Sequence, residues 1–291
     1  MGWHATLHLD YRLQGERTVA HDRHEGPLRV LQRLYPEGPQ VCHHVLVHPP
    51  GGIAGGDHLE ITAQLGPRAH ALITTPGATR FYRSEGAQAV QHARVHLERH
   101  ARLEWLPLET LAYDGCQARN RLEVHLQPQS AMMGWDVLAL GLPAANVPFS
   151  RGSFWQDLRV HHAGHTWLER GQVAAEDTRL LDAPLGWDGH RVLGVMWMAW
   201  ADATDATDAA DSRSSIMGPR LLEAARAQCH RSELRSHLGV TQPWSGPLHV
   251  VVLRALAPRV EPLMQVLMQV RAHWRQLAWS LEAAPPRVWR T

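Results

Sequence analysis

The chain has 291 residues, enough to bury a substantial core, and its 29 basic side chains are nearly balanced by 28 acidic ones. This balance argues against a nucleic acid as the main partner, because non-specific binding to DNA requires clustered positive charge. Three cysteines lie far apart without a CxxC pair, which indicates neither a disulfide framework nor a cysteine zinc site. Because no signal-like start or apolar stretch of 18 residues occurs, we expect a cytoplasmic protein that does not enter a membrane.

Alternating apolar residues predict strands over about the first 200 residues. The pattern runs from Ala5 to Leu13 and returns at 59–65, 69–73, 93–97, 101–105 and 122–126. Leu65, Leu97 and Leu126 each precede a short turn, and a looser fourth unit lies around 158–168. We therefore expect a mainly β fold of hairpin-like units, stacked as in a β-solenoid or arranged as an ordinary β-sandwich without a true repeat.

A polar run, ADATDATDAADSRSS at 201–215, has no apolar period and predicts a mobile surface loop. After it, Pro219 can open a short helix that continues through Leu221 and Ala225, because proline is tolerated in a first turn. The β-rich body at about 1–200, this loop and the region at 216–284 are expected to form a single domain over residues 1–291.

The region at 216–284 reads as helix, strand and helix. Residues 250–253 form a short apolar run typical of a buried strand. From Val260 to Leu281, apolar residues recur every three or four positions and predict a helix. The fold is thus expected to have two helices in its C-terminal third. Met264 and Met268 widen the apolar surface of the second helix, which packs either within its own domain or against a partner protein.

Sequence motifs for catalysis are missing. The chain contains no GxSxG, HExxH or P-loop pattern. A glycine-rich run at 51–56 leads into a strand and not into a helix, which favours a tight turn over a phosphate-binding loop. We expect a protein that is not an enzyme.

The 21 histidines and a cysteine next to two of them raise the question of a metal site. Imidazole and thiolate suit nickel, copper and zinc, so Cys42 and His43 are weak metal candidates. Neighbouring residues on a strand point to opposite faces, however, and cannot both bind one ion without a bulge. We expect most histidines, including His43, His44 and His161, to be solvated at the surface.

Four carboxylates stand near glycine turns or tryptophans. Asp57 and Glu60 follow the first glycine run, Asp136 follows Gly134 and Trp135, and Glu169 lies in the segment WLER. From the residues alone they are ordinary surface charges.

Several segments in the same order resemble the urease accessory protein UreD family. They are HPPGGIAGGD at 48–57, TTPGATRFYRS at 74–84, LEWLP at 103–107, GWDVLALG at 134–141, LERGQV at 168–173 and PPRVWRT at 285–291. Together they span nearly the whole chain, and several collinear matches are far more specific than any one glycine turn.

The resemblance implies a non-enzymatic maturation factor that joins UreF-like and UreG-like accessory proteins on apo-urease in a hetero-oligomer and helps nickel reach the active site. It also implies an internal, water-filled passage for nickel, with Asp57, Glu60, Asp136 and Glu169 as its metal-binding residues. No cofactor would be permanently bound, and nickel would be in transit. Oxygen ligands suit this role because they hold nickel more weakly than thiolates or clustered imidazoles.

Three positions depart from the family pattern. Arg80 replaces a common lysine, Leu142 replaces a frequent arginine, and the segment at 146–148 lacks the usual Gly-Glu pair, so we expect locally altered partner binding. Two other functions stay open. One is a β-rich interaction module without a metal role. The other is a β-solenoid carbohydrate-active enzyme, which needs paired carboxylates and an aromatic platform that the 12 tryptophans could supply.

Overall fold

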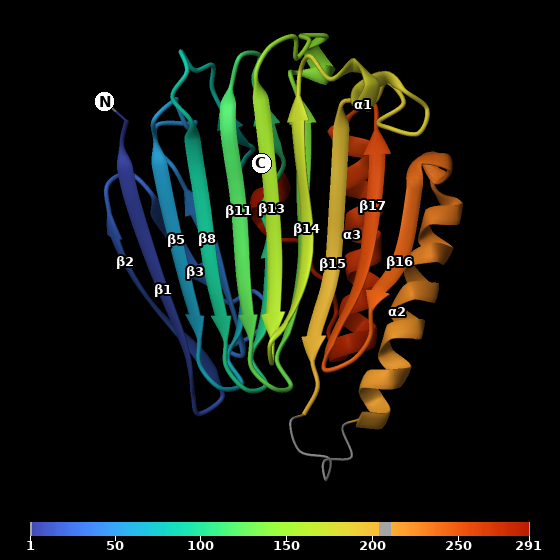
Figure 1. Ribbon diagram of the computed structural model, residues 1–291. Helices are drawn as coiled ribbons and strands as arrows, with labels where there is room; N and C mark the ends of the chain where they lie inside the picture. The colour runs from blue at the N-terminus through green and yellow to red at the C-terminus, as the bar shows by residue number, and fades with distance from the viewer. Residues whose placement is uncertain (1, 204–210, 291) are drawn as a thin grey trace.

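The computed structural model describes residues 2–203 and 211–290, which form two β-sheets and two long helices in three layers (Figure 1). The outer sheet has seven strands in the order β14-β13-β11-β8-β5-β1-β2. The inner sheet, between the outer sheet and the helices, has the order β16-β17-β15-β12-β9-β6-β4-β3, and in addition β10 pairs with β12 and β7 pairs with β10. The strands are β1 (His4–Gln14), β2 (Arg17–Glu25), β3 (Arg29–Leu34), β4 (Val41–Val47), β5 (His58–Leu65), β6 (His70–Thr74), β7 (Thr79–Phe81), β8 (Ala89–Leu97), β9 (Arg102–Leu106), β10 (Thr110–Ala112), β11 (Gln117–Leu126), β12 (Ala131–Leu140), β13 (Ser153–His162), β14 (His165–Ala174), β15 (Val192–Ala201), β16 (Leu238–Trp244) and β17 (Leu248–Ala257). The helices are α1 (Thr178–Asp182), α2 (Asp211–Arg231) and α3 (Val260–Trp279), and short 3-10 turns are η1 (Pro143–Ala145), η2 (Arg235–His237) and η3 (Arg287–Arg290).

The repeats predicted from the leucine spacing are real, and they stack as in a β-solenoid. Strands β5, β8, β11 and β13 are parallel neighbours in the outer sheet, and β6, β9 and β12 are parallel neighbours in the inner sheet. Leu65 lies opposite Leu97, which lies opposite Leu126, so the turn-preceding leucines occupy equivalent positions. The mainly β, stacked fold expected from the sequence is confirmed.

The fourth expected unit, around 158–168, is a hairpin in which β13 pairs antiparallel with β14, but the expected hairpin-like form of the three units before it is wrong. After β5 the chain turns into β6 of the other sheet, and it crosses back to the outer sheet before β8. A strand that is buried on one face shows alternating apolar and polar residues. This pattern is the same whether the next strand pairs with it in a hairpin or lies in a second sheet. The sequence pattern therefore could not distinguish the two connections.

Two hydrophobic cores separate the three layers. The first lies between the sheets and includes Leu59, Ile61 and Trp197. The second lies between the inner sheet and helices α2 and α3 and includes Trp135 and Trp274. The inner sheet is covered on both faces, and a strand such as β17 therefore carries a nearly continuous apolar run. Residues 250–253 lie in β17, which confirms the predicted buried strand.

Helix α2 is longer than the sequence suggested. It begins at Asp211, so Pro219 lies inside it, and the expected short helix opening at that proline is wrong. Of the run 201–215, Ala201 ends β15 and the backbone at 211–215 is helical, whereas 204–210 lie outside the described residues. Proline inside a helix removes one backbone hydrogen bond, and packing of Leu221 and Ala225 into the second core offsets that loss.

Helix α3 confirms the predicted helix, ending two residues before Leu281. Met264 is buried and Met268 is partly buried in the second core, so this apolar surface packs within the chain itself. No described helix is both long enough and apolar enough to cross a membrane.

Candidate functional site

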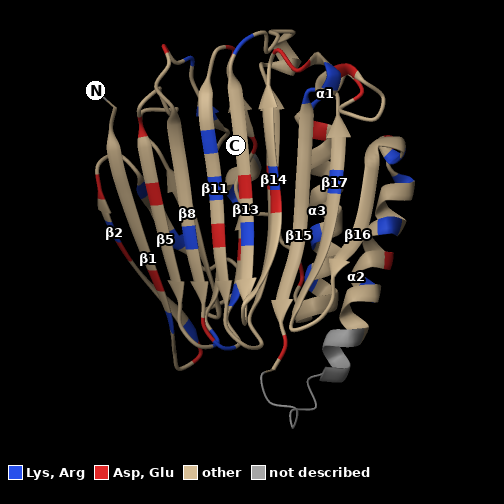
Figure 2. Cartoon of the chain, in the orientation of Figure 1, with Lys and Arg blue, Asp and Glu red and all other residues tan. Residues whose placement is uncertain are grey.

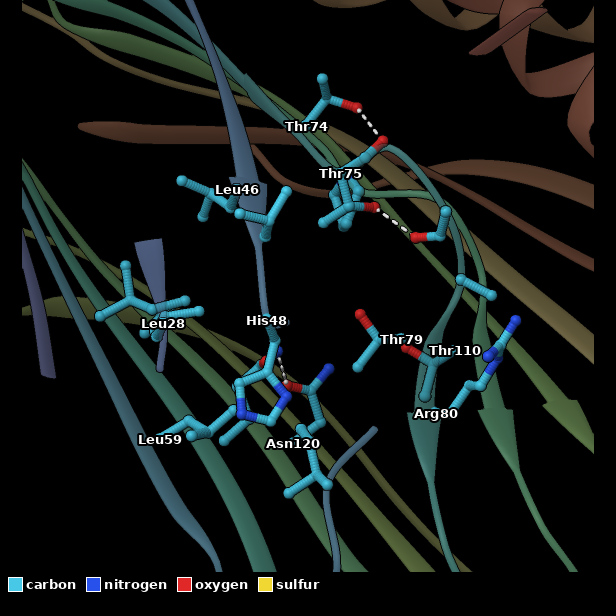
Figure 3. Close-up of a pocket in the computed structure, with 18 of the residues that line it drawn as sticks. Leu28, Leu46, His48, Leu59, Thr74, Thr75, Thr79, Arg80, Thr110 and Asn120 are labelled. Carbon is cyan, nitrogen blue, oxygen red and sulfur yellow. Dashed lines mark hydrogen bonds between the residues drawn. The ribbon is translucent and has the colours of Figure 1, made fainter. Parts of the chain in front are cut away.

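A cavity of about 320 Å³ lies between the two sheets (Figure 3). Its walls are mainly apolar and come from Leu59 of β5 and Leu122 of β11 on one side and Ile73 of β6 and Trp105 of β9 on the other. Asp136 of β12 is the only acidic residue among the described residues that line it. The cavity is therefore mainly apolar, with one carboxylate and two arginines, Arg80 and Arg121, among its polar lining residues.

The two glycine-rich segments with the family resemblance form one wall of this cavity, through residues 47–53 and 73–80. They are joined by backbone hydrogen bonds: Ile53 N–H donates to Arg80 O at 2.7 Å, and Tyr82 N–H donates to Ile53 O at 2.9 Å. A Cβ atom on Gly52 would lie 2.3 Å from the Tyr82 ring. Glycine is thus needed for the close approach of the two segments.

Other family-like segments meet behind this wall. Trp289, near the C-terminus, donates a hydrogen bond from Nε1 to Thr74 Oγ1 at 2.8 Å, and its ring lies 5.3 Å from that of Trp135. Trp135 in turn donates to Pro107 O at 2.7 Å. Thr74 and Pro107 both line the cavity. Segments far apart in the sequence therefore build one structure around it.

Asp136 is held by two amides from the outer sheet. Gln156 Nε2 donates a short hydrogen bond to its Oδ2, and Asn120 Nδ2 lies 3.4 Å from the same oxygen. Burial raises the pKa of Asp136 to about 7, although the hydrogen bond from Gln156 opposes the rise. A carboxyl group with this pKa gains and loses its proton near neutral pH, and a cation can take the place of that proton.

His48 supplies a second possible metal ligand at the cavity. It lines the same cavity as Asn120 and Leu59 (Figure 3). Both ring nitrogens are buried and have no hydrogen-bond partner among the described residues. Burial lowers the pKa of His48, so the imidazole is neutral at pH 7, the form that binds metals.

Asp57 lies outside the cavity wall. Its Oδ1 accepts a hydrogen bond from Trp3 N–H, and its Oδ2 accepts one from Ala54 N–H, both at 2.8 Å. The carboxylate closes the glycine turn and ties it to the N-terminal strand. Both of its oxygens are therefore used in holding the backbone.

Glu60 and Glu169 also lie away from the cavity. Glu60 alternates with the inward-facing Leu59 and lies on the exposed face of the outer sheet, where Arg94 is 3.6 Å away. Glu169 of β14 forms a two-pronged ion pair with Arg254 of β17, with Arg254 Nε 2.7 Å from Glu169 Oε1. The structure does not bring the four predicted carboxylates together, and only Asp136 faces the cavity.

Cys42 and His43 are both buried, which corrects the expectation of a solvated His43. Cys42 lies in the core between the sheets, where burial raises its thiol pKa, and His43 lies 2.6 Å from Glu37 through Nε2. His44 is also buried, with Nδ1 2.8 Å from the Tyr11 hydroxyl, and burial lowers its pKa to about 4. Strand β4 is covered on both faces, so its side chains are excluded from solvent whichever face they point to.

Sequence reasoning missed His48, Asn120 and Gln156. A signal was present for two of them. Asn120 shares the apolar phase of Leu122 and Val124, and Gln156 shares that of Leu158 and Val160. A polar side chain at an inward-facing position of a strand must find a buried partner, which here is Asp136.

These features define a two-sheet, β-solenoid-like protein with a mainly apolar, partly open cavity between the sheets, in which Asp136 is the one carboxylate among the described residues. The model of the UreD urease accessory protein family matches residues 4–290, and the chain belongs to this family. It is 55% identical over 293 residues to the urease accessory protein UreD of Leptothrix cholodnii. The UreD proteins of Variovorax paradoxus and Methylibium petroleiphilum are 50% and 51% identical, and each of the three alignments covers 100% of both chains.

Proposed function

We propose that this chain is a urease maturation factor, acting with UreF-like and UreG-like proteins on apo-urease, and that nickel passes through its internal cavity. Membership of the UreD family supports the role in maturation. The observation that carries the nickel pathway is the position of Asp136, a carboxylate with a pKa of about 7 inside the cavity. Nickel is cargo in this proposal and not a resident cofactor.

The chemistry of the cavity suits brief binding. One carboxylate and one neutral imidazole, His48, offer few ligands, so an ion would be held weakly enough to leave. Burial disfavours the unpaired Asp136 carboxylate, so a cation that replaces its proton would be favoured near neutral pH. The apolar walls would keep competing ligands away from the ion.

The maturation role is tested in a cell that carries the urease operon of the host with this gene deleted. Urease is purified with and without a complementing copy, and its activity and nickel content are measured. We expect inactive, nickel-poor urease after deletion and recovery after complementation. Fully nickel-loaded urease after deletion would contradict the maturation role and favour an interaction module without a metal function.

The pathway is tested by complementing with single variants. Asp136→Asn keeps the shape of the side chain but removes its charge, and we expect the nickel content of urease to fall about tenfold, a loss typical of weakened metal binding. Asp182→Asn, at an exposed carboxylate outside the cavity, is the matched control. Normal nickel content with Asp136→Asn would rule out the cavity route, and a loss with Glu60→Gln, Asp57→Asn or Glu169→Gln would extend the route to those predicted residues.

A further inference from the structure

The exposed face of the outer sheet carries a row of histidines. His96 of β8, His125 of β11 and His161 of β13 lie opposite one another in the parallel register. Their rings are stacked, with centroids 4.6 Å apart for the first pair and 4.7 Å for the second. The row follows from the solenoid, because one residue type at equivalent positions of successive repeats forms a ladder.

Glu123 completes a cluster with two of these histidines. Its Oε1 lies 3.2 Å from His125 Nε2 and 3.8 Å from His161 Nε2. One ligand atom from each of the three residues lies within 4.8 Å of those of the other two. Two imidazole nitrogens and a carboxylate oxygen thus converge on one point of the exposed sheet.

His161 is already oriented for binding. Its Nδ1 lies 2.8 Å from the Thr166 hydroxyl, and its Nε2 is buried without a hydrogen-bond partner among the described residues. A hydrogen bond to the second ring nitrogen is the usual way in which a metal-binding histidine is held in place.

The basic neighbours of Glu123 outside the cluster lie at its Oε2 atom and leave Oε1 available to a metal ion. Arg121 Nη2 lies 2.7 Å from Oε2, and His92 Nε2 lies 3.7 Å from the same oxygen. Arg159 faces the same side of the sheet from β13 and pairs with Asp157 at 2.8 Å. Figure 2 shows a basic band on β8 and both basic and acidic bands on β11 and β13. The arginine at Oε2 fixes the carboxylate with Oε1 toward the histidines.

We propose that Glu123, His125 and His161 form a binding site for a divalent transition ion of the nickel and zinc class. Imidazole nitrogens and one carboxylate suit these ions, and solvent fills the remaining positions. Metal bonds of about 2.0–2.2 Å require ligand atoms roughly 3–3.5 Å apart, which small rotations of these partly exposed side chains achieve. None of its three ligands lines the cavity, and the site does not depend on the proposed nickel route.

A second cluster, His4, His58 and Glu60, provides the matched comparison. It lies on the same sheet face and has the same residue types. His4 is mostly exposed, and no hydrogen bond comparable to that of Thr166 orients either of its histidines among the described residues. We therefore expect it to bind metal more weakly.

The test is isothermal titration of the purified full chain with NiCl₂ and, separately, with ZnCl₂. We expect the double variant His125→Ala/His161→Ala to lose one equivalent of each ion, whereas His58→Ala keeps it. Thr166→Val leaves all three ligands in place but removes the orienting hydroxyl, and we expect about tenfold weaker binding. Asp136→Asn should leave this equivalent unchanged, which separates the site from the cavity.

Unchanged binding in the double variant would overturn the proposal, as would loss of the equivalent in His58→Ala. Binding that is equal in the wild type and Thr166→Val would contradict the assigned orientation of His161. Circular dichroism checks that each variant is folded, which we expect because the substituted side chains lie at the sheet surface.

Discussion

Burial of Asp136 lowers the stability of the folded protein at the pH values where its carboxyl group ionises in the unfolded chain. In the unfolded chain its pKa has the ordinary value of 3.8, and burial in the cavity raises it to about 7. Below about pH 3, well under both pKa values, the group is protonated in both states, and the folded protein has no disadvantage. As pH rises from about 3 to 7, the unfolded chain ionises first, and stability falls by up to about 4 kcal/mol.

Asp136→Asn removes this dependence. We expect the variant to be more stable than the wild type by about 2–4 kcal/mol at pH 8 and equally stable near pH 3, because the amide has no proton to lose. The measurement is urea unfolding at both pH values. Asp182→Asn, at an exposed carboxylate, should show no such gain at pH 8. An equal effect of Asp136→Asn at both pH values would mean that ionisation of Asp136 is not its cause.

Gly52 allows the two glycine-rich segments to touch. A methyl group there would overlap the Tyr82 ring, whereas one on Gly77 of the second segment would meet open space. We expect Gly52→Ala to lower the free energy of unfolding by about 1–3 kcal/mol and Gly77→Ala to leave it unchanged or slightly raised. Thermal unfolding of both variants checks this. Equal melting temperatures would show that the segments separate easily.

At the scale of elements, helix α3 is held to the inner sheet by ions as well as by apolar packing. Glu104 of β9 is fully buried, 2.8 Å from Arg271 Nε and 2.9 Å from Arg275 Nε. Arg275 also pairs with Glu37 at 2.6 Å. Burial tends to raise the pKa of Glu104, but Arg271, with His70 and Arg275, outweighs it and lowers the pKa to about 2.

Glu104→Ala would leave two buried arginines without their shared partner. We expect a loss of about 3–5 kcal/mol, compared with less than about 1 kcal/mol for Asp182→Ala at an exposed ion pair. Because the pKa of Glu104 is lowered on folding, its contribution is complete above about pH 4.5 and is lost as pH falls toward 2. Urea unfolding between pH 7 and 3 measures both effects. A loss below 1 kcal/mol would mean that water or Glu37 compensates the arginines.

The sequence predicted elements better where burial is one-sided. In β5 the alternation of Leu59 and Ile61 with polar residues gave the strand and its inward face correctly. In α3 the three- and four-residue spacing gave the helix, but it did not reveal that Arg271 and Arg275 are buried. Arginine is almost always at the surface, and only the pairing with Glu104, 167 positions away from Arg271, makes these two exceptions possible.

At the scale of the whole molecule, the leucine spacing predicted the stacking, but not that the turn after each of these strands crosses to the second sheet. A turn after Leu65 leads equally well to a hairpin partner or across a core, and the choice is set by long-range packing. The cavity could not be predicted for the same reason, since its wall combines β5, β11 and β12. The family resemblance pointed to Asp136, and the structure adds the amides that hold it.

Glu169 and Arg254 join the two sheets on the side where β14 of the outer sheet meets β17 of the inner sheet. Both side chains are partly exposed, so we expect Glu169→Arg or Arg254→Glu alone to lower stability by about 1 kcal/mol or less, through loss of the pair and like-charge repulsion. The double exchange restores opposite charges, and we expect it to recover most of that loss in thermal unfolding. Stability that stays as low in the double variant as in the single ones would mean that the ion pair does not join the sheets.

The same double variant separates two roles for Glu169. If the residue serves only to join the sheets, the exchanged pair should support normal nickel content in purified urease. If the carboxylate must stand on β14 to bind passing nickel, the exchange moves it to β17, and nickel content falls although stability is recovered. We expect normal nickel content, because both carboxylate oxygens already bind Arg254 and neither faces the cavity.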